Sequence, residues 1–181
     1  MMNIRLLFFT LLMPLFVQAQ GDNADVIEWR ANRKLNWDDF KGNAPEGSQE
    51  AALTNCGFGY ASNNVNRFEE AKFTVTVQFY RSKSWVHHDK ESVRLLQHEQ
   101  RHFDLSELYA RQFRKRLSER KWTGADLKKA EKIYQDLFKE LDDQQHKYDE
   151  ETIHGLDTEK QNQWNETIAK ELKDLSAFGM N

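Results

Sequence analysis

This chain of 181 residues contains one cysteine and two prolines, and it has no excess of positive charge. Cys56 is the only cysteine, which excludes an internal disulfide, so the fold must depend on its core or on a metal ion. The net charge is −3, from 26 basic and 29 acidic residues, which argues against a nucleic-acid-binding protein because such proteins need clustered positive charge. At 30% charged and 12% aromatic residues, the composition is that of a folded protein.

The chain also lacks an apolar run long enough to cross a bilayer, which needs about 20 residues. The run Leu6–Val17 follows the basic Arg5 and is shorter than this, and a small-residue cleavage pattern ends at Ala19. The sequence therefore predicts a signal peptide over residues 1–19 and a single domain over residues 20–181. We expect export to the periplasm or the medium, without stable membrane insertion.

Hydrophobic periodicity indicates strands in the first half of the remaining chain. Apolar and polar residues alternate strictly over residues 71–80 and less cleanly over residues 51–62. Shorter strand candidates lie at residues 25–29 and 34–37. Together these segments predict a small antiparallel sheet.

The second half of the chain has helical periodicity. A first helix is predicted from about Asp89 to Glu119, a second opens at the capping signal Thr123–Asp126 and ends at Gly155, and a third starts at Thr158. Few residues join the first two helices, so they should be antiparallel neighbours. The predicted fold class is α+β, a small antiparallel sheet followed by three helices.

Two histidines and a glutamate interrupt the apolar side of the first helix, in the sequence His98-Glu99-Gln100-Arg101-His102. Residues four apart lie about 6 Å apart on one helical face, so both imidazoles can bind one ion while Glu99 reaches a bound water. Zinc accepts imidazole nitrogen and keeps one position open for water in catalytic sites. The competing interpretation is a pair of core or interface histidines with satisfied ring nitrogens. Together with the export signal, the motif favours a zinc site on a zincin-like active-site helix, in a single zincin-like domain.

The sequence leaves the third zinc ligand open. Leu105 and Leu108 occupy positions where the metzincin pattern needs glycine and histidine, so that pattern is excluded. Glu131 and Glu140 are possible ligands from the next helix, but nothing distinguishes either. His154 precedes Gly155, where the second helix stops and a side chain can point back toward a neighbouring element. The remaining histidines, His87, His88 and His146, fit loops or solvated faces.

Four segments carry motifs that belong together: His98–Asp104, Lys83–Val86, Leu35–Gly42, and Tyr148–Gly155 followed by Trp164. In combination they resemble a family of bacterial predicted secreted zinc-dependent proteases, a domain of unknown function. The resemblance covers most of the chain after residue 19, and only Arg101 departs from it, where a glycine is expected. It implies a zinc-dependent protease whose late motif supplies a further site residue.

That late motif offers Asp149 and His154 as third ligand. Antiparallel pairing across the turn at residues 120–124 places residues 143–147 opposite the histidine pair, which suits Asp149. A chain that bends back at Gly155 suits His154. We predict His154 as the third ligand, with Asp149 as the alternative, and expect the residue that does not bind zinc to hydrogen-bond a ligating imidazole.

These residues predict a zinc metallopeptidase that binds Zn²⁺ through His98, His102 and His154 and cleaves peptide or protein substrates. Glu99 would act as general base toward a zinc-activated water and then protonate the leaving amine. A strand such as residues 71–80 could pair with an extended peptide. Tyr148 could contact the developing oxyanion, although its place in a helical stripe favours packing.

Two other classes of function fit the sequence. One is a non-catalytic, zinc-stabilised binding or scaffold module of the cell envelope, whose partner surface would be the basic run Arg111–Lys132. The other is a metal-free helical protein. A scaffold should tolerate Glu99→Gln, whereas an enzyme should lose turnover with this change.

Overall fold

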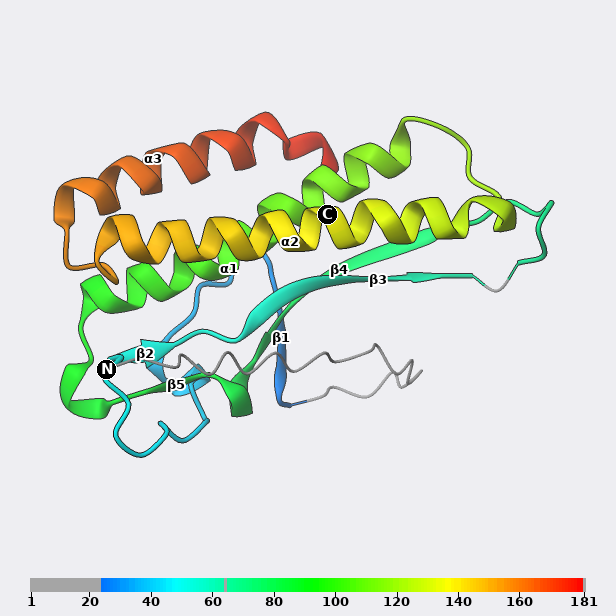
Figure 1. The fold of residues 1–181 in the computed structure, drawn as a ribbon. Helices are drawn as coiled ribbons and strands as arrows, with labels where there is room; N and C mark the ends of the chain where they lie inside the picture. Colours follow the sequence, from blue (N-terminus) through cyan, green and yellow to red (C-terminus); the bar gives the residue numbers. More distant parts are fainter. Residues whose placement is uncertain (1–23, 64, 181) are drawn as a thin grey trace, which may run out of the picture.

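The computed structural model describes residues 24–63 and 65–180. The signal peptide predicted over residues 1–19 lies outside the described residues. Strands occupy the first half of the described chain and helices the second, with a small antiparallel sheet along one side of three long helices (Figure 1). The predicted α+β fold class is confirmed. Within the described ranges, no helix combines the length and hydropathy needed to cross a bilayer.

The main sheet has three antiparallel strands in the order β1-β4-β3. These are β1 (Val26–Glu28), β3 (Cys56–Ser62) and β4 (Phe73–Tyr80). The alternation predicted for β4 is confirmed, since Val75, Val77 and Phe79 are buried. β4 is the central strand, and it pairs with β3 at residues 73–79 and with β1 at residues 78–80. That this strand could pair with a substrate peptide stays a prediction, and none of its residues lines the pocket described below.

A second, two-stranded sheet pairs β2 (Ala52–Leu53) with β5 (Trp85–Val86). The strand predicted over residues 51–62 is thus two strands in different sheets. They separate at Asn55, whose N–H donates to Ser84 Oγ at 2.9 Å. The strand candidate at residues 34–37 is wrong.

That segment leads instead into a 3-10 helix, η1 (Trp37–Asp39). Asn36 and Asp39 form a capping box at its start, in which the N–H of Asn36 donates to the Asp39 carboxylate at 2.8 Å. This local hydrogen bonding overrides the apolar pattern that suggested a strand.

The three helices are α1 (Val93–Ser118), α2 (Leu127–Thr152) and α3 (Thr158–Asp174). Ser92 caps α1 by accepting the N–H of Leu95 at 3.1 Å, so α1 begins later than predicted. Asp157 caps α3 in the same way, through the N–H of Lys160. Short 3-10 helices complete the chain: η2 (Arg81–Lys83), η3 (His88–Lys90), η4 (Gly124–Asp126) and η5 (Ser176–Phe178).

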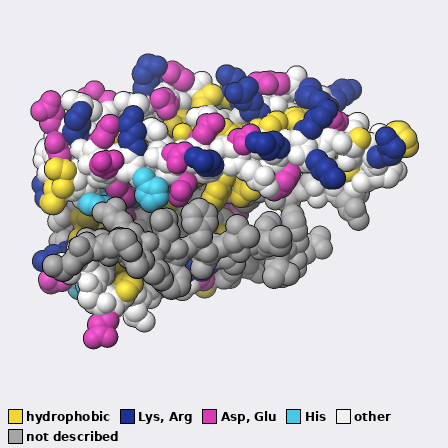
Figure 2. Space-filling view, viewed as in Figure 1, with side chains coloured by type: hydrophobic (Ala, Val, Ile, Leu, Met, Phe, Trp, Pro, Cys, Tyr) yellow, Lys and Arg dark blue, Asp and Glu magenta, His cyan; other side chains and the backbone are white. Residues whose placement is uncertain are grey.

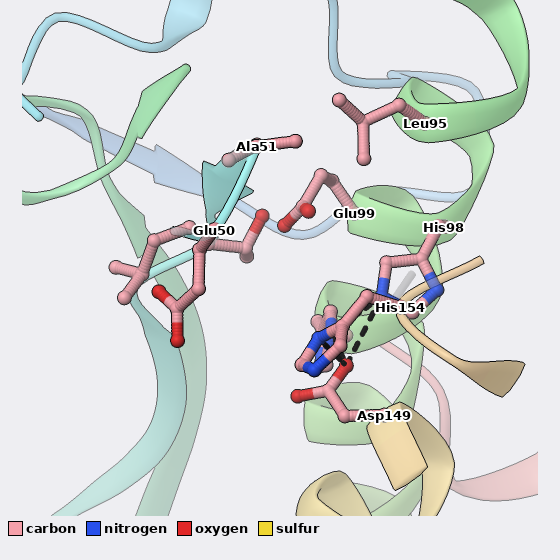
Figure 3. A pocket seen from close by; sticks show the side chains of 11 residues that line it. Glu50, Ala51, Leu95, His98, Glu99, Asp149 and His154 are labelled. Atoms are coloured by element: carbon pink, nitrogen blue, oxygen red, sulfur yellow. Dashed lines mark hydrogen bonds and ion pairs between the residues drawn. The ribbon is translucent and has the colours of Figure 1, made fainter. Parts of the chain in front are cut away.

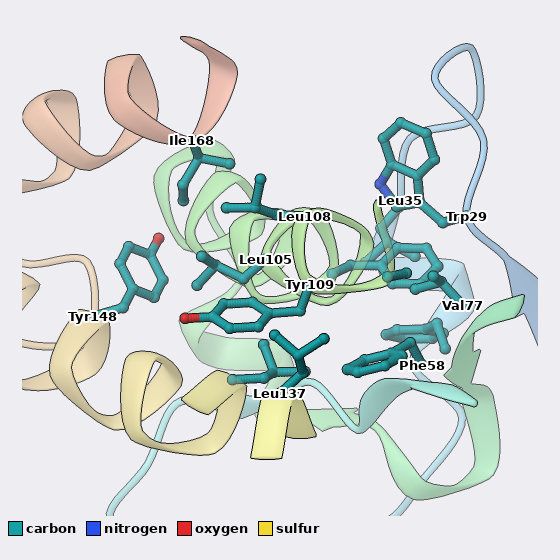
Figure 4. Close-up of a cluster of buried hydrophobic side chains, with 14 of the residues drawn as sticks. Trp29, Leu35, Phe58, Val77, Leu105, Leu108, Tyr109, Leu137, Tyr148 and Ile168 are labelled. Carbon is teal, nitrogen blue, oxygen red and sulfur yellow. The ribbon is translucent and has the colours of Figure 1, made fainter. Parts of the chain in front are cut away.

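The core surrounds α1, which packs against β3 and β4 on one side and against α2 and α3 on the other. Phe103 and Phe113 of α1 are fully buried, and each such burial contributes roughly 2–3 kcal/mol to folding. A helix held by the sheet on one side and by two helices on the other is a rigid base for the residues it carries. Figure 4 shows side chains from all of these elements meeting there, among them Phe58, Val77, Leu105, Leu108, Tyr109, Leu137 and Ile168.

A buried ionic cluster connects the C-terminal half of α1 to β4 and to η5. Glu107 is fully buried and accepts from Arg111 at 2.7 Å and from Arg114 at 3.2 Å. Arg114 also donates to the carbonyl oxygens of Val75 in β4 and Phe178 in η5. Every partner is a charge or a backbone carbonyl, as a buried ion requires.

The outer surface of α2 carries both signs of charge. Lys132, Lys139 and Lys147 each pair with a carboxylate four residues further along the helix. Basic and acidic side chains accordingly alternate across the helical face seen in Figure 2. This pattern is that of a solvated helix face.

Candidate metal centre

His98, His102 and Asp149 bring three possible ligand atoms together between α1 and α2. Nε2 of His98 and Nε2 of His102 lie 3.3 Å apart, and Oδ1 of Asp149 lies 3.0 Å from the first and 2.9 Å from the second (Figure 3). A tetrahedral zinc site with bonds of about 2.05 Å places its ligand atoms about 3.3 Å apart. The group could therefore hold a metal ion with little adjustment.

The cluster of His98, His102 and Asp149 favours a positive charge at its centre, as the pKa shifts of His102 and Asp149 indicate. Burial by itself lowers the pKa of His102, but the hydrogen bond to Asp149 and the charge of Asp149 outweigh burial and raise this pKa to about 9. Burial raises the pKa of Asp149 less than its hydrogen bonds to His102 and His98 lower it, so the pKa of this carboxyl lies well below its usual range. A proton supplies this charge in the absence of metal, and a cation can replace it.

A glutamine fixes the orientation of each imidazole. Nδ1 of His98 lies 3.1 Å from Oε1 of Gln161 in α3, and Nδ1 of His102 is hydrogen-bonded to Oε1 of Gln145 in α2. An amide oxygen can only accept, so Nδ1 is the donor in both rings. Nε2 of each ring therefore faces the cluster, and it can bind a metal ion once it carries no proton.

Other residues of the histidine motif anchor α1 to the N-terminal part of the chain. Asp104 is buried and accepts from Trp29 Nε1 at 2.8 Å and from Gln100 Nε2 at 2.9 Å. Gln100 Oε1 accepts the N–H of Leu35 at 2.8 Å. Arg101 donates to Asp104 and to Asn165 of α3, so it serves as a tie between helices.

Tyr148 packs between the two imidazoles. Its ring stacks on His98 at 4.6 Å and 16°, and meets His102 edge-on at 5.0 Å. The residue is fully buried, and its hydroxyl is hydrogen-bonded to Gln161 and to the carbonyl oxygen of His98. The structure thus gives Tyr148 the packing role.

The turn after α2 approaches the site closely. Ile153, His154 and Gly155 all have positive φ, at 50°, 52° and 79°. A Cβ on Gly155 would lie 2.9 Å from Cβ of His98, so only glycine allows this contact. Thr152 Oγ1 accepts the N–H of Gly155 at 3.2 Å and holds the turn in place. These contacts explain the late Thr152-x-His154-Gly155 motif.

His154, the predicted third ligand, lies at the rim of the cluster. Its Nδ1 is 3.7 Å from Oδ1 of Asp149, its side chain is 63% exposed, and its ring centroid is 6.5 Å from that of His98. The alternative ligand, Asp149, is the residue that joins the histidine pair. The geometry therefore favours Asp149, and His154 would have to move to reach the same ion.

Glu99 shares a pocket with the three ligand atoms. Its side chain is almost fully buried, and Figure 3 shows its carboxylate pointing away from α1 toward the chain around Ala51. The pocket has a volume of about 100 Å³, room for an ion and a few waters. Its opposite wall is residues 50–54, which include β2, and Leu95 and His154 also line it. No pattern in the sequence indicated this wall.

The other titratable candidates lie outside the pocket. Glu131 accepts the hydroxyl of Tyr60 at 2.5 Å and so ties α2 to β3. His88 and His146 have exposed side chains, as expected for solvated positions. Burial raises the pKa of Cys56 to about 12, so its thiol is not a nucleophile near neutral pH.

Comparison with known proteins gives one match. The family described as "Bacterial protein of unknown function (DUF922)" matches residues 31–155, a range that includes every residue lining the pocket. No curated protein and no solved structure matches the chain.

Proposed function

The chain belongs to the DUF922 family of bacterial proteins of unknown function, and we propose that it is an exported, zinc-dependent peptidase. One observation carries the proposal: His98, His102 and Asp149 place three ligand atoms within 4.8 Å of one another, in a pocket that also holds Glu99. Two imidazoles and one carboxylate are a donor set of catalytic zinc sites, and three protein ligands leave one position for water.

The mechanism divides the work among these residues. When bound, zinc would lower the pKa of a water molecule to about 7 and polarise the scissile carbonyl. His98, His102 and Asp149 would hold the ion. Glu99 accepts the proton of the attacking water and passes it to the leaving nitrogen, as its place in the same pocket allows.

The wall opposite α1 is the proposed binding edge for the peptide. Among the described residues, β2 pairs only with β5, and residues 50–54 line the pocket. An extended substrate can add to the free edge of β2 through main-chain hydrogen bonds. This edge takes the role that the sequence suggested for β4.

The decisive experiment compares zinc-loaded wild type and Glu99→Gln on a peptide library read by mass spectrometry. Glu99→Gln should keep its zinc and its fold but lose at least about 100-fold in kcat, because the proton acceptor is gone. Glu119→Gln, the same change in an exposed residue that follows α1, is the matched control and should be fully active. Equal activity of Glu99→Gln and wild type would exclude the peptidase and leave the scaffold interpretation.

Metal content tests the ligands separately from activity. Zinc, iron and manganese should be measured together, since two histidines and one carboxylate also suit ferrous iron. We expect one zinc per wild-type chain, loss of zinc in His102→Ala and Asp149→Ala, and retention in His154→Ala. Retention in Asp149→Ala with loss in His154→Ala would instead assign His154 as the third ligand.

A further inference from the structure

The charged side chains that line the pocket are mostly of one sign. Among the 11 lining residues there are three carboxylates, those of Glu50, Glu99 and Asp149, and no lysine or arginine. A bound dication would balance two of these carboxylates. The pocket would then retain one negative charge. Asp149 would bind the ion and Glu99 would accept the proton of the water, so Glu50 is the carboxylate without a role in the proposed metal chemistry.

Glu50 stands at the start of the wall formed by residues 50–54. Glu50 is exposed, and its backbone N–H donates to Ser48 Oγ at 3.3 Å. Within residues 24–63 and 65–180, its carboxylate makes no ion pair with a basic side chain, so its negative charge is not neutralised by a lysine or arginine of the described chain. Figure 3 shows Glu50 across the pocket from Asp149 and His154.

We infer that Glu50 selects peptides that carry a positively charged group beside the cleaved bond. The inference rests on the proposed function and adds the substrate class to it. A peptide lying along the edge of β2 passes Glu50, so an ammonium or guanidinium there gains a favourable ion pair, whereas a substrate carboxylate is repelled. The group could be a lysine or arginine side chain, or the free amino end of a short peptide.

The test uses zinc-loaded protein and a peptide that it cleaves, with the residues flanking the cleaved bond changed to Lys, Gln or Glu. Acetylated and amidated ends isolate the side-chain effect, and one further arm leaves the amino end free. We expect kcat/KM to fall in the order Lys, Gln, Glu. Glu50→Gln should lower kcat/KM for the Lys peptide about three- to fivefold, mainly through KM, and leave the Gln peptide unchanged.

Two variants and one condition sharpen the result. Glu46→Gln removes the same charge from the same loop outside the pocket and should behave as wild type. Glu50→Lys should favour the Glu peptide, and the wild-type preference should weaken at high salt. A preference confined to the free-amine arm would assign the amino end as the recognised group.

Two outcomes would overturn the inference and leave the peptidase proposal intact. In the first, wild type cleaves the Lys, Gln, Glu and free-amine peptides equally well. In the second, the preference for the Lys peptide survives Glu50→Gln. Failure to cleave any peptide would overturn both.

Discussion

At the candidate metal centre, each imidazole is paired with the side-chain amide of a glutamine. His102 is held twice by Gln145, whose Oε1 accepts from Nδ1 and whose Nε2 donates to the His102 carbonyl oxygen at 3.2 Å. His98 depends on Gln161, which also bonds Tyr148 and Asn165. Substituting Gln145 therefore disturbs fewer other contacts than substituting Gln161, and it tests how much the orientation of an imidazole contributes to metal affinity.

Gln145→Leu should weaken zinc binding about 10- to 100-fold, because Nδ1 of His102 loses its acceptor and the ring loses its fixed direction. Competition with a chromophoric chelator measures the affinity, and circular dichroism checks the fold. Gln144→Leu, one position earlier on α2, is the control and should bind zinc like wild type. Equal affinity of both variants would show that the amide does not orient the ring.

At the scale of one element, the turn after α2 is the part whose backbone is strained. Ile153 is β-branched, has φ of 50° and is 56% exposed, so it adopts an unfavourable conformation without burying its side chain. Gly155 has positive φ too, but glycine adopts it without strain, and its missing side chain makes room for His98. Substitutions at Ile153 and at Gly155 should therefore have opposite effects on the free energy of unfolding.

Gly155→Ala should lower the free energy of unfolding by about 1–3 kcal/mol and weaken zinc binding, since the new methyl group meets the His98 ring. Ile153→Asn should raise the free energy of unfolding by about 0.5–1 kcal/mol, because asparagine tolerates positive φ. Urea denaturation of the metal-free proteins measures both. A stable Gly155→Ala protein with normal zinc affinity would mean that the turn can move away from His98.

At the scale of the whole molecule, a metal ion would join α1 to α2, two helices connected at the other end by the short segment before η4. An ion that binds only the folded state stabilises it by about 4 kcal/mol at a free concentration of 1,000 times Kd. The effect should extend to the entire core, because α1 contacts the sheet and both other helices.

Removing the metal with a chelator should lower the Tm by about 10 °C, given that 1 kcal/mol corresponds to about 2–4 °C for a domain of this size. Differential scanning calorimetry with and without chelator measures the change. His102→Ala should show no response to the chelator, which separates metal loss from buffer effects. An unchanged wild-type Tm would argue that no metal links the helices.

Local features of this protein follow from its sequence alone. The strand β4, the three helices and the facing of His98 and His102 are all predictable, because strand and helix periods are set by backbone geometry within one segment. Capping chemistry marks helix ends nearly as well, as at Gly155. Where short-range hydrogen bonds compete with the period, as in η1, the sequence misleads.

Only the tertiary structure decided what meets the histidine pair. Antiparallel pairing predicted residues 143–147 opposite the pair, and Gln145 does contact His102, while Asp149 contacts both histidines. The choice between Asp149 and His154 depends on the axial offset of α1 and α2, which their packing in the shared core sets. The pocket wall at residues 50–54 depends on the pairing of β2 with β5, which no local pattern encodes.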